Sequence, residues 1–203
     1  MREKKFTTRQ FVEMALLVAV ILLLAFTPLG YIRTLGLEIT LIVVPVTVGA
    51  VTLGPAAGAV LGAAFGITSF IQCFGMSPFG GVLLGINPFY TFIVCVVSRV
   101  LMGFLTGLFY QGMKKALAPK ISVVAANLIG PLLNTFFFMG TLVFFFYHTE
   151  YIQGIAESMG ASNALAFVAA FVGINGVIEA AACFVVGSAV SRALQTVLKT
   201  DEN

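Results

Sequence analysis

The chain has 203 residues, of which 60% are hydrophobic and only 9% are charged, and its mean hydropathy is +1.07. Soluble domains carry about 25% charged residues, so this composition excludes an ordinary water-soluble domain and indicates a protein embedded in lipid. The net charge of +3 is too small to suggest nucleic acid as a partner.

Six apolar segments follow one another along the chain, and together they predict a single membrane domain over residues 1–203. A bilayer admits only helices or closed barrels, and these segments lack the alternation of a barrel strand. The prediction is therefore an all-α integral membrane protein with six transmembrane helices. The approximate helices are 9–26, 39–53, 57–73, 88–111, 121–147 and 163–194.

The first predicted helix follows the basic sequence MREKKFTTRQ and meets no small-residue cleavage site, so we expect no cleaved signal peptide. Ala15 and Ala19 are four residues apart on this helix. Small residues at this spacing let another backbone approach closely. Packing within the chain and contact with a partner helix both fit this pattern.

The third and fourth predicted helices repeat the small-residue pattern with glycine. Gly58, Gly62 and Gly66 share one face of the third helix, and Gly103 and Gly107 share one face of the fourth. We expect these glycines to bring helices of this chain together, because a compact bundle needs close backbone contacts.

The connection between these two helices, residues 74–87, reads FGMSPFGGVLLGIN and contains four glycines and a proline. This composition fits a mobile cover over a cavity. It fits a passive loop with backbone bends equally well.

Arg99 is the most informative single residue, because it lies in the middle of residues 87–111, which are otherwise apolar or small. A guanidinium at the centre of a membrane span costs roughly 3 kcal/mol on translocon scales. Such a residue is retained where it meets a partner, a water-filled cavity or an anionic ligand. The sequence therefore predicts an interior site.

Further polar residues fall at a similar depth on the last two helices. Asn134 is near the centre of the fifth, and Asn175 and Glu179 are one turn apart on the sixth. With Arg99 they predict a substrate-binding cavity in the outer half of the bundle. In the structural alternative, Arg99 pairs with Glu179 and the asparagines only link helices by hydrogen bonds. The remaining substrate-binding candidates lie near the outer connections and are Gln72, Asn87, Tyr90 and Thr40.

Basic residues give the expected orientation. Nine of them fall on one side of the predicted spans: Arg2, Lys4, Lys5, Arg9, Lys114, Lys115, Lys120, Arg192 and Lys199. The other side holds Arg33 alone, so the positive-inside rule places both termini in the cytoplasm. The protein is expected in a cell membrane, namely a bacterial plasma membrane.

Residues for chemistry are scarce. The chain has no Gly-Lys dipeptide for a phosphate-binding loop, and its one histidine, His148, has no second histidine to complete a zinc site. Cys73, Cys95 and Cys183 lie singly in apolar stretches and read as small hydrophobic residues. We expect no catalytic residues, no metal and no cofactor, and hence no enzyme.

Several short strings can now be read together: TPLGYI at 27–32, Ile39-Thr40 leading to VPV at 44–46, LGPAAG at 53–58 and SRVLMG at 98–103. Together with the six predicted spans and the Ala15/Ala19 spacing, these strings make the chain resemble the substrate-binding S components of energy-coupling factor (ECF) vitamin transporters. The resemblance covers nearly the whole chain. The TPLGYI and LGPAAG strings are most similar to the pantothenate-specific branch. The proline usual in that branch before the arginine of the fourth helix is Ser98 here.

The resemblance implies a function that the residues alone do not. An S component binds a vitamin from outside and associates with a membrane coupling subunit that carries two cytoplasmic ATPases, which accounts for the missing nucleotide motif. The resemblance also assigns Ala15 and Ala19 to docking on the coupling subunit. Two alternatives stay open: an S component for riboflavin or another small vitamin, and a membrane assembly or scaffold protein without a ligand. A buried arginine suits a carboxylate, and the absence of Trp favours pantothenate over a flavin.

Overall fold

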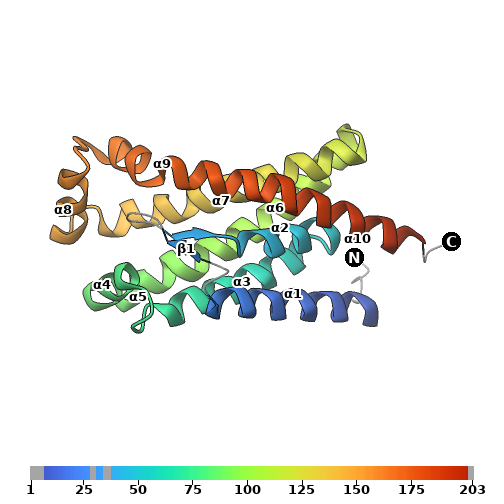
Figure 1. Ribbon diagram of the computed structural model, residues 1–203, viewed down its shortest axis with the longest axis horizontal. Coiled ribbons are helices and arrows are strands. Elements are labelled where there is room, and N and C mark those ends of the chain that lie inside the picture. Colours follow the sequence, from blue (N-terminus) through green and yellow to red (C-terminus); the bar gives the residue numbers. More distant parts are fainter. Residues whose placement is uncertain (1–6, 28–30, 34–37, 201–203) are drawn as a thin grey trace.

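The chain forms an elongated bundle of helices in the computed structural model, which describes residues 7–27, 31–33 and 38–200 (Figure 1). The description leaves out the side chains of residues 31–33, 38–40, 119, 120, 174, 175, 178 and 196–200. Helix α1 starts and α10 finishes at the same end of the bundle, whereas α4, α5 and α8 lie at the other end (Figure 1). We call these the terminal end and the far end.

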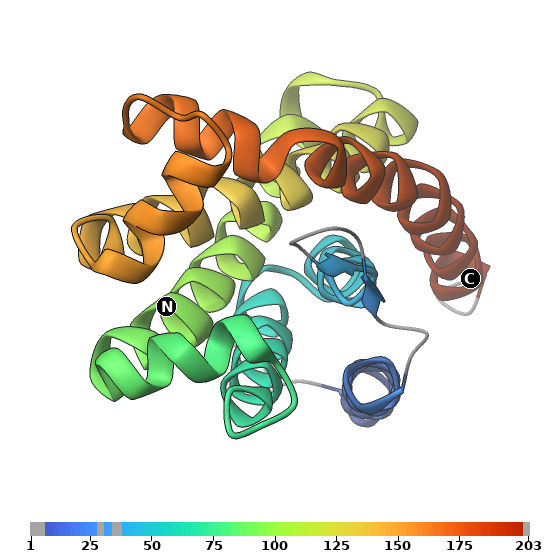
Figure 2. The same cartoon turned by 60° about the vertical axis from the view of Figure 1, so that its left-hand side comes forward.

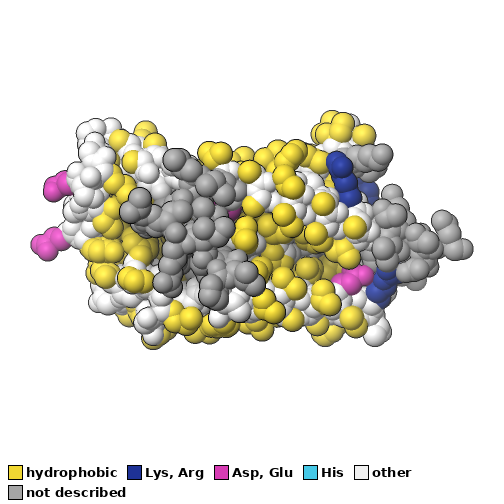
Figure 3. Space-filling model, in the orientation of Figure 1, with side chains coloured by type: hydrophobic (Ala, Val, Ile, Leu, Met, Phe, Trp, Pro, Cys, Tyr) yellow, Lys and Arg dark blue, Asp and Glu magenta, His cyan; other side chains and the backbone are white. Residues whose placement is uncertain are grey.

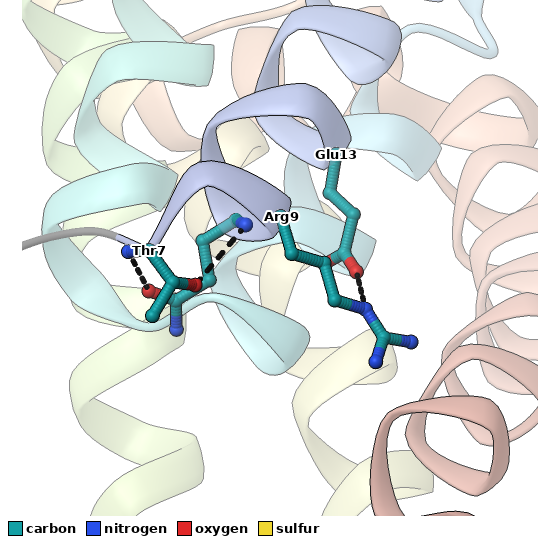
Figure 4. Close-up of polar contacts among 4 residues, drawn as sticks. Thr7, Arg9 and Glu13 are labelled. Carbon is teal, nitrogen blue, oxygen red and sulfur yellow. Dashed lines mark hydrogen bonds and ion pairs between the residues drawn. The ribbon is translucent and has the colours of Figure 1, made fainter. Parts of the chain in front are cut away.

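Helix α1 (Thr8–Phe26) begins with a capping box. The Thr7 hydroxyl accepts a hydrogen bond from the Gln10 backbone N–H, and the Gln10 side chain accepts one from the Thr7 N–H (Figure 4). Within the same stretch, the Arg9 guanidinium lies 3.2 Å from the carboxylate of Glu13, one turn further along the helix (Figure 4). The two capping bonds satisfy backbone donors that a helix start otherwise leaves open, and the ion pair adds a side-chain contact across the next turn.

Only a narrow stripe of α1 is buried, namely Leu17, Ile21 and Ala25. This stripe packs on α2 (Val43–Thr52) and α3 (Pro55–Gln72). In Figure 2, α1 (dark blue) lies at the edge of the bundle. Met14, Val18 and Leu24 border this stripe and are partly buried, whereas the opposite face of α1 is turned away from the protein.

The connection after α1 contains a short antiparallel hairpin, β1 (Tyr31–Arg33) and β2 (Glu38–Thr40), in which Tyr31 pairs with Thr40. Residues 39 and 40 were expected in the second helix, but the structure has them in a strand and begins α2 at Val43. Ile39 and Thr40 are β-branched, and such residues favour a strand when a pairing partner is near.

The segment 74–87, predicted as a loop, is mostly helical. It contains α4 (Pro78–Ile86), which is followed directly by α5 (Pro88–Phe92). The Ser77 hydroxyl accepts from the Gly80 N–H, and the Asn87 side chain accepts from the Tyr90 N–H, so each helix has an N-cap followed by proline. Local capping thus outweighs the low helix propensity of the glycines.

The rest of the chain is helical, with two π-helical turns. After α5 come η2 (Ile93–Val97), α6 (Ser98–Ala116) and α7 (Pro119–Phe146). Then follow α8 (Glu150–Ser158), α9 (Ala164–Ala182), η3 (Cys183–Gly187) and α10 (Ser188–Thr200). Helix α9 is interrupted at Gly173, whose φ of 32° suits glycine.

Four helical segments among the described residues are long and apolar enough to cross a membrane: Thr8–Phe26, Pro55–Gln72, Pro88–Ala116 and Ile121–Phe146. Val43–Thr52 and Ala164–Gly173 are apolar but shorter. The space-filling view agrees for the face that it shows, where hydrophobic side chains predominate between the ends and most charged side chains lie at the two ends (Figure 3). The helical membrane class is therefore confirmed, and the count of six spans stays a prediction.

Helices α3 and α6 approach each other through glycine. A Cβ added at Gly58 would lie 2.3 Å from the Gly103 carbonyl oxygen, and one at Gly62 would lie 2.2 Å from the Arg99 carbonyl oxygen. At Gly66 it would lie 2.6 Å from the Cα of Val96. The glycines thus pack within the chain as expected, and they fix the backbone around Arg99 against α3.

We expect Gly62→Ala to lower the thermal unfolding midpoint of the purified protein in detergent. The added methyl group must displace the α6 backbone, and overpacking of this kind costs about 1–3 kcal/mol. Gly140→Ala is the matched control on α7, because a Cβ there meets nothing within 4 Å. Equal midpoints for the two variants would contradict the close approach of α3 and α6.

Candidate functional site

The guanidinium of Arg99 is buried, with 6% of the residue exposed. Its Nη1 donates one hydrogen bond to the Val94 carbonyl oxygen at 2.8 Å and another to the Ser98 hydroxyl at 3.0 Å. Both partners precede Arg99 in the chain, so the side chain is directed back toward the far end of the bundle, as helical side chains prefer.

Two aromatic rings flank the same guanidinium. Its carbon Cζ lies 4.4 Å from the ring centroid of Phe138 on α7 and 5.2 Å from that of Phe65 on α3. Cation–π contacts at these distances stabilise a cation more strongly where water is excluded. Arg99 is therefore held between two neighbouring helices as well as by its own.

A second polar contact joins α7 to α9. Asn134 Nδ2 donates to Glu179 Oε1 at 2.9 Å, and both residues are more than nine-tenths buried. The Oδ1 of Asn134 is buried and has no hydrogen-bond partner among the described residues. Leaving a buried carbonyl oxygen without a hydrogen bond costs free energy, so this atom is a candidate acceptor for a hydrogen bond from a ligand.

These two contacts are close to each other along α7. Phe138, which flanks Arg99, is four residues from Asn134, a separation of about 6 Å along a helix axis. The structure therefore brings Arg99, Asn134 and Glu179 into one region between α3, α6, α7 and α9.

Three other predicted site residues have local structural roles. The Gln72 side chain donates to the Ala25 carbonyl oxygen and so ties the end of α3 to the end of α1. Asn87 caps α5, as described above. Tyr90 is 37% exposed and stacks on Phe145 of α7, with ring centroids 4.5 Å apart. Their contacts place them around the far end of the bundle.

The side chains of Thr40 and Asn175 lie outside the described residues. Their backbones are in β2 and in α9, two residues after the interruption at Gly173. Their assignment to the site remains a prediction.

Ala15 and Ala19 are exposed, on the part of α1 that faces away from the bundle. Bulky exposed side chains surround them on this helix, among them Phe11, Leu22 and Phe26. The sequence left two explanations for these alanines, packing within the chain and contact with a partner helix. Their exposure means that they do not pack within the chain.

Sequence reasoning missed three groups beside Arg99: Ser98, Phe65 and Phe138. A signal existed for Phe138, which shares a helical face with Asn134 at a spacing of four residues. Ser98 was considered only as a departure from a family pattern. Nothing in the sequence indicated the π-helical turn that aligns Val94 and Ser98 with the arginine.

Residues 9–191 match the family model described as the substrate-specific component of ECF transporters. The chain belongs to this family. The resemblance drawn from the sequence is thereby confirmed at the level of the family. No curated protein matches the chain. As a substrate-specific (S) component, it is a membrane-embedded transporter subunit that binds a small molecule and works with the other ECF subunits, and the family is not a class of enzymes.

Proposed function

We propose that this S component binds the vitamin pantothenate and that Arg99 recognises its carboxylate. The buried guanidinium between Phe65 and Phe138 carries the proposal, because a cation in such surroundings attracts an anion strongly. Pantothenate is a small carboxylate with two hydroxyl groups and one amide. A flavin, in contrast, brings no carboxylate to this cation.

The two hydrogen bonds described for Arg99 start from the same nitrogen. Nη1 already donates to Val94 and Ser98. A carboxylate that pairs with the Nε–Nη2 edge would keep both of these bonds in place, in the bidentate geometry that arginine favours. A hydrogen bond to a charged group contributes about 1.5–3 kcal/mol.

Asn134 supplies the complementary acceptor. Its amide nitrogen already donates to Glu179, so its orientation is fixed and its Oδ1 can accept a hydrogen bond from a ligand hydroxyl or amide. Glu179 then supports the site from behind by holding Asn134. In this proposal the interhelical hydrogen bond and ligand binding are compatible roles of one side chain.

The charge distribution supports an orientation with the terminal end in the cytoplasm. Lys114 and Lys115 lie in the last turn of α6, whereas Glu150 begins α8 at the far end. Basic residues near spans favour the cytoplasmic side. Ligand would then enter from outside at the far end, where α4 and α8 cover the bundle.

Docking completes the proposed mechanism. The exposed Ala15 and Ala19 on α1 would contact the membrane coupling subunit, which carries the two ATPases. Bulky exposed side chains on either side of two alanines leave a shallow strip in which a partner helix can approach closely.

The ligand can be identified by mass spectrometry of the supernatant released when the purified protein is denatured. We expect pantothenate, because tight binding retains a ligand through purification. The same preparation of Arg99→Gln should release much less. After removal of bound ligand, titration with pantothenate should restore one equivalent per protein.

Other results would redirect or end the proposal. Recovery of riboflavin would keep the S-component function and reject the carboxylate argument. Recovery of no small molecule, together with no binding of added pantothenate or riboflavin, would favour the scaffold alternative.

A further inference from the structure

We propose that Ser98, presented by the π-helical turn before it, is a positioning residue that fixes the guanidinium of Arg99 for carboxylate binding. This inference rests on the proposed function, since it concerns how the same arginine is held. Ser98 itself is fully buried and is not placed in contact with ligand.

The π-helical turn η2 changes the hydrogen bonds just before Arg99. In an α-helix the Ser98 N–H would bond to the carbonyl four residues earlier, that of Val94. Here it bonds to the Ile93 carbonyl, five residues earlier. The Val94 carbonyl oxygen instead accepts from two side chains, the Ser98 hydroxyl and Arg99 Nη1.

The Ser98 hydroxyl has one role as a donor and one as an acceptor. It donates its single proton to Val94, which turns its lone pairs toward Arg99 Nη1 at 3.0 Å. The two N–H bonds of Nη1 thus point at two oxygens that are themselves linked. This arrangement defines the position of the guanidinium along the helix and its rotation about the side-chain axis.

The backbone that carries this arrangement is also fixed. Gly62 of α3 lies directly against the Arg99 carbonyl, as the 2.2 Å distance of an added Cβ indicates. Arginine is long and has many rotamers, so holding it before ligand arrives reduces the entropy lost on binding. Removal of the Ser98 hydroxyl should therefore weaken carboxylate binding although the charge remains.

A buried hydroxyl on α6 need not have this role. Thr106 is also fully buried, and its hydroxyl donates to the Met102 carbonyl oxygen four residues earlier at 2.7 Å. The Thr106 hydroxyl thus bonds to its own helix as the Ser98 hydroxyl does, but among the contacts described it accepts no hydrogen bond from a charged group. Thr106→Val is therefore a matched control for loss of a buried hydroxyl from this helix.

The test measures the dissociation constants of the intact purified protein for pantothenate and for pantothenol, its neutral alcohol analogue. Ser98→Ala should weaken pantothenate binding about 3- to 10-fold, the effect of losing one ordinary hydrogen bond, and leave pantothenol binding unchanged. The preference for the acid should fall between that of the parent and that of Arg99→Gln. Ser98→Thr, which keeps the hydroxyl, should keep most of the preference, and Thr106→Val should keep all of it.

A double variant separates positioning from an independent effect. If Ser98 acts through Arg99, adding Ser98→Ala to Arg99→Gln should produce no further loss of affinity for either compound. An equal loss in both backgrounds, an unchanged preference in Ser98→Ala, or an equal loss for acid and alcohol would each overturn the inference.

Failure of the inference can be told from failure of the proposed function. If Arg99→Gln removes the preference while Ser98→Ala does not, only the role of Ser98 is rejected. If the parent protein binds neither compound, or Arg99→Gln binds both as the parent does, the pantothenate proposal fails and the Ser98 inference fails with it.

Discussion

Replacing Arg99 with glutamine should remove the preference of the protein for pantothenate over pantothenol. The two ligands differ at the carboxylate, so their ratio of affinities isolates the contribution of this group. Loss of a charge-assisted contact of about 1.5–3 kcal/mol corresponds to roughly a ten- to hundredfold weaker affinity for the acid. Equilibrium binding to purified parent and variant proteins measures the ratio directly.

A lysine at the same position separates charge from geometry. Arg99→Lys keeps the positive charge but loses the planar fork, so it cannot offer a carboxylate two parallel N–H bonds from two nitrogens. We expect it to recover only part of the lost affinity. If Arg99→Gln binds acid and alcohol as the parent does, Arg99 is a structural residue, and the alternative in which it pairs with Glu179 is favoured.

Substitution of Ala15 or Ala19 with tryptophan should stop pantothenate uptake in cells that contain the whole transporter, while the affinity of the purified S component stays unchanged. Both residues are exposed on α1, so a large side chain there does not disturb the bundle. It would instead keep a partner backbone away from the strip between the bulkier residues. Uptake of labelled pantothenate and co-purification of the coupling subunit are the two measurements.

A suitable control is Leu132→Trp, which places the same side chain on another helix at a position that is 60% exposed. It should support uptake at the level of the parent. Normal uptake by both alanine variants would reject α1 as the docking surface. Loss of ligand binding in these variants would mean that α1 supports the binding site instead.

The membrane class and the family could be predicted because they depend on features that sequence carries well. The long apolar segments and the glycines that join α3 to α6 have their expected roles in the structure, and Arg99 is buried as its position in an apolar segment suggested. Gly62 is an example. The sequence shows that the residue has no side chain, and in the structure this lets α3 lie directly against the backbone of Arg99.

Features that depend on local capping or on hydrogen-bond register were harder to predict. The helix α4 had a readable signal in Ser77 followed by Pro78, but the glycines after it suggested a loop. The π-helical turn before Ser98 and the interruption at Gly173 had none, because hydrophobic periodicity does not resolve a single extra residue in a turn. Among the predicted site residues, Gln72 and Asn87 make local structural hydrogen bonds, and polarity alone does not distinguish such a role from ligand binding.

The turn η2 also sets the rotational phase between the two parts of the segment Pro88–Ala116. A π-helical turn contains one residue more than an α-helical turn would, and one residue corresponds to about 100° around a helix axis. A single helical wheel drawn from Tyr90 to Arg99 therefore assigns one of them to the wrong face. Loss of one residue from Ile93–Val97 would restore α-helical bonding and rotate Arg99 by about 100° relative to α5. The length of this stretch, as much as its composition, determines that the guanidinium lies between Phe65 and Phe138.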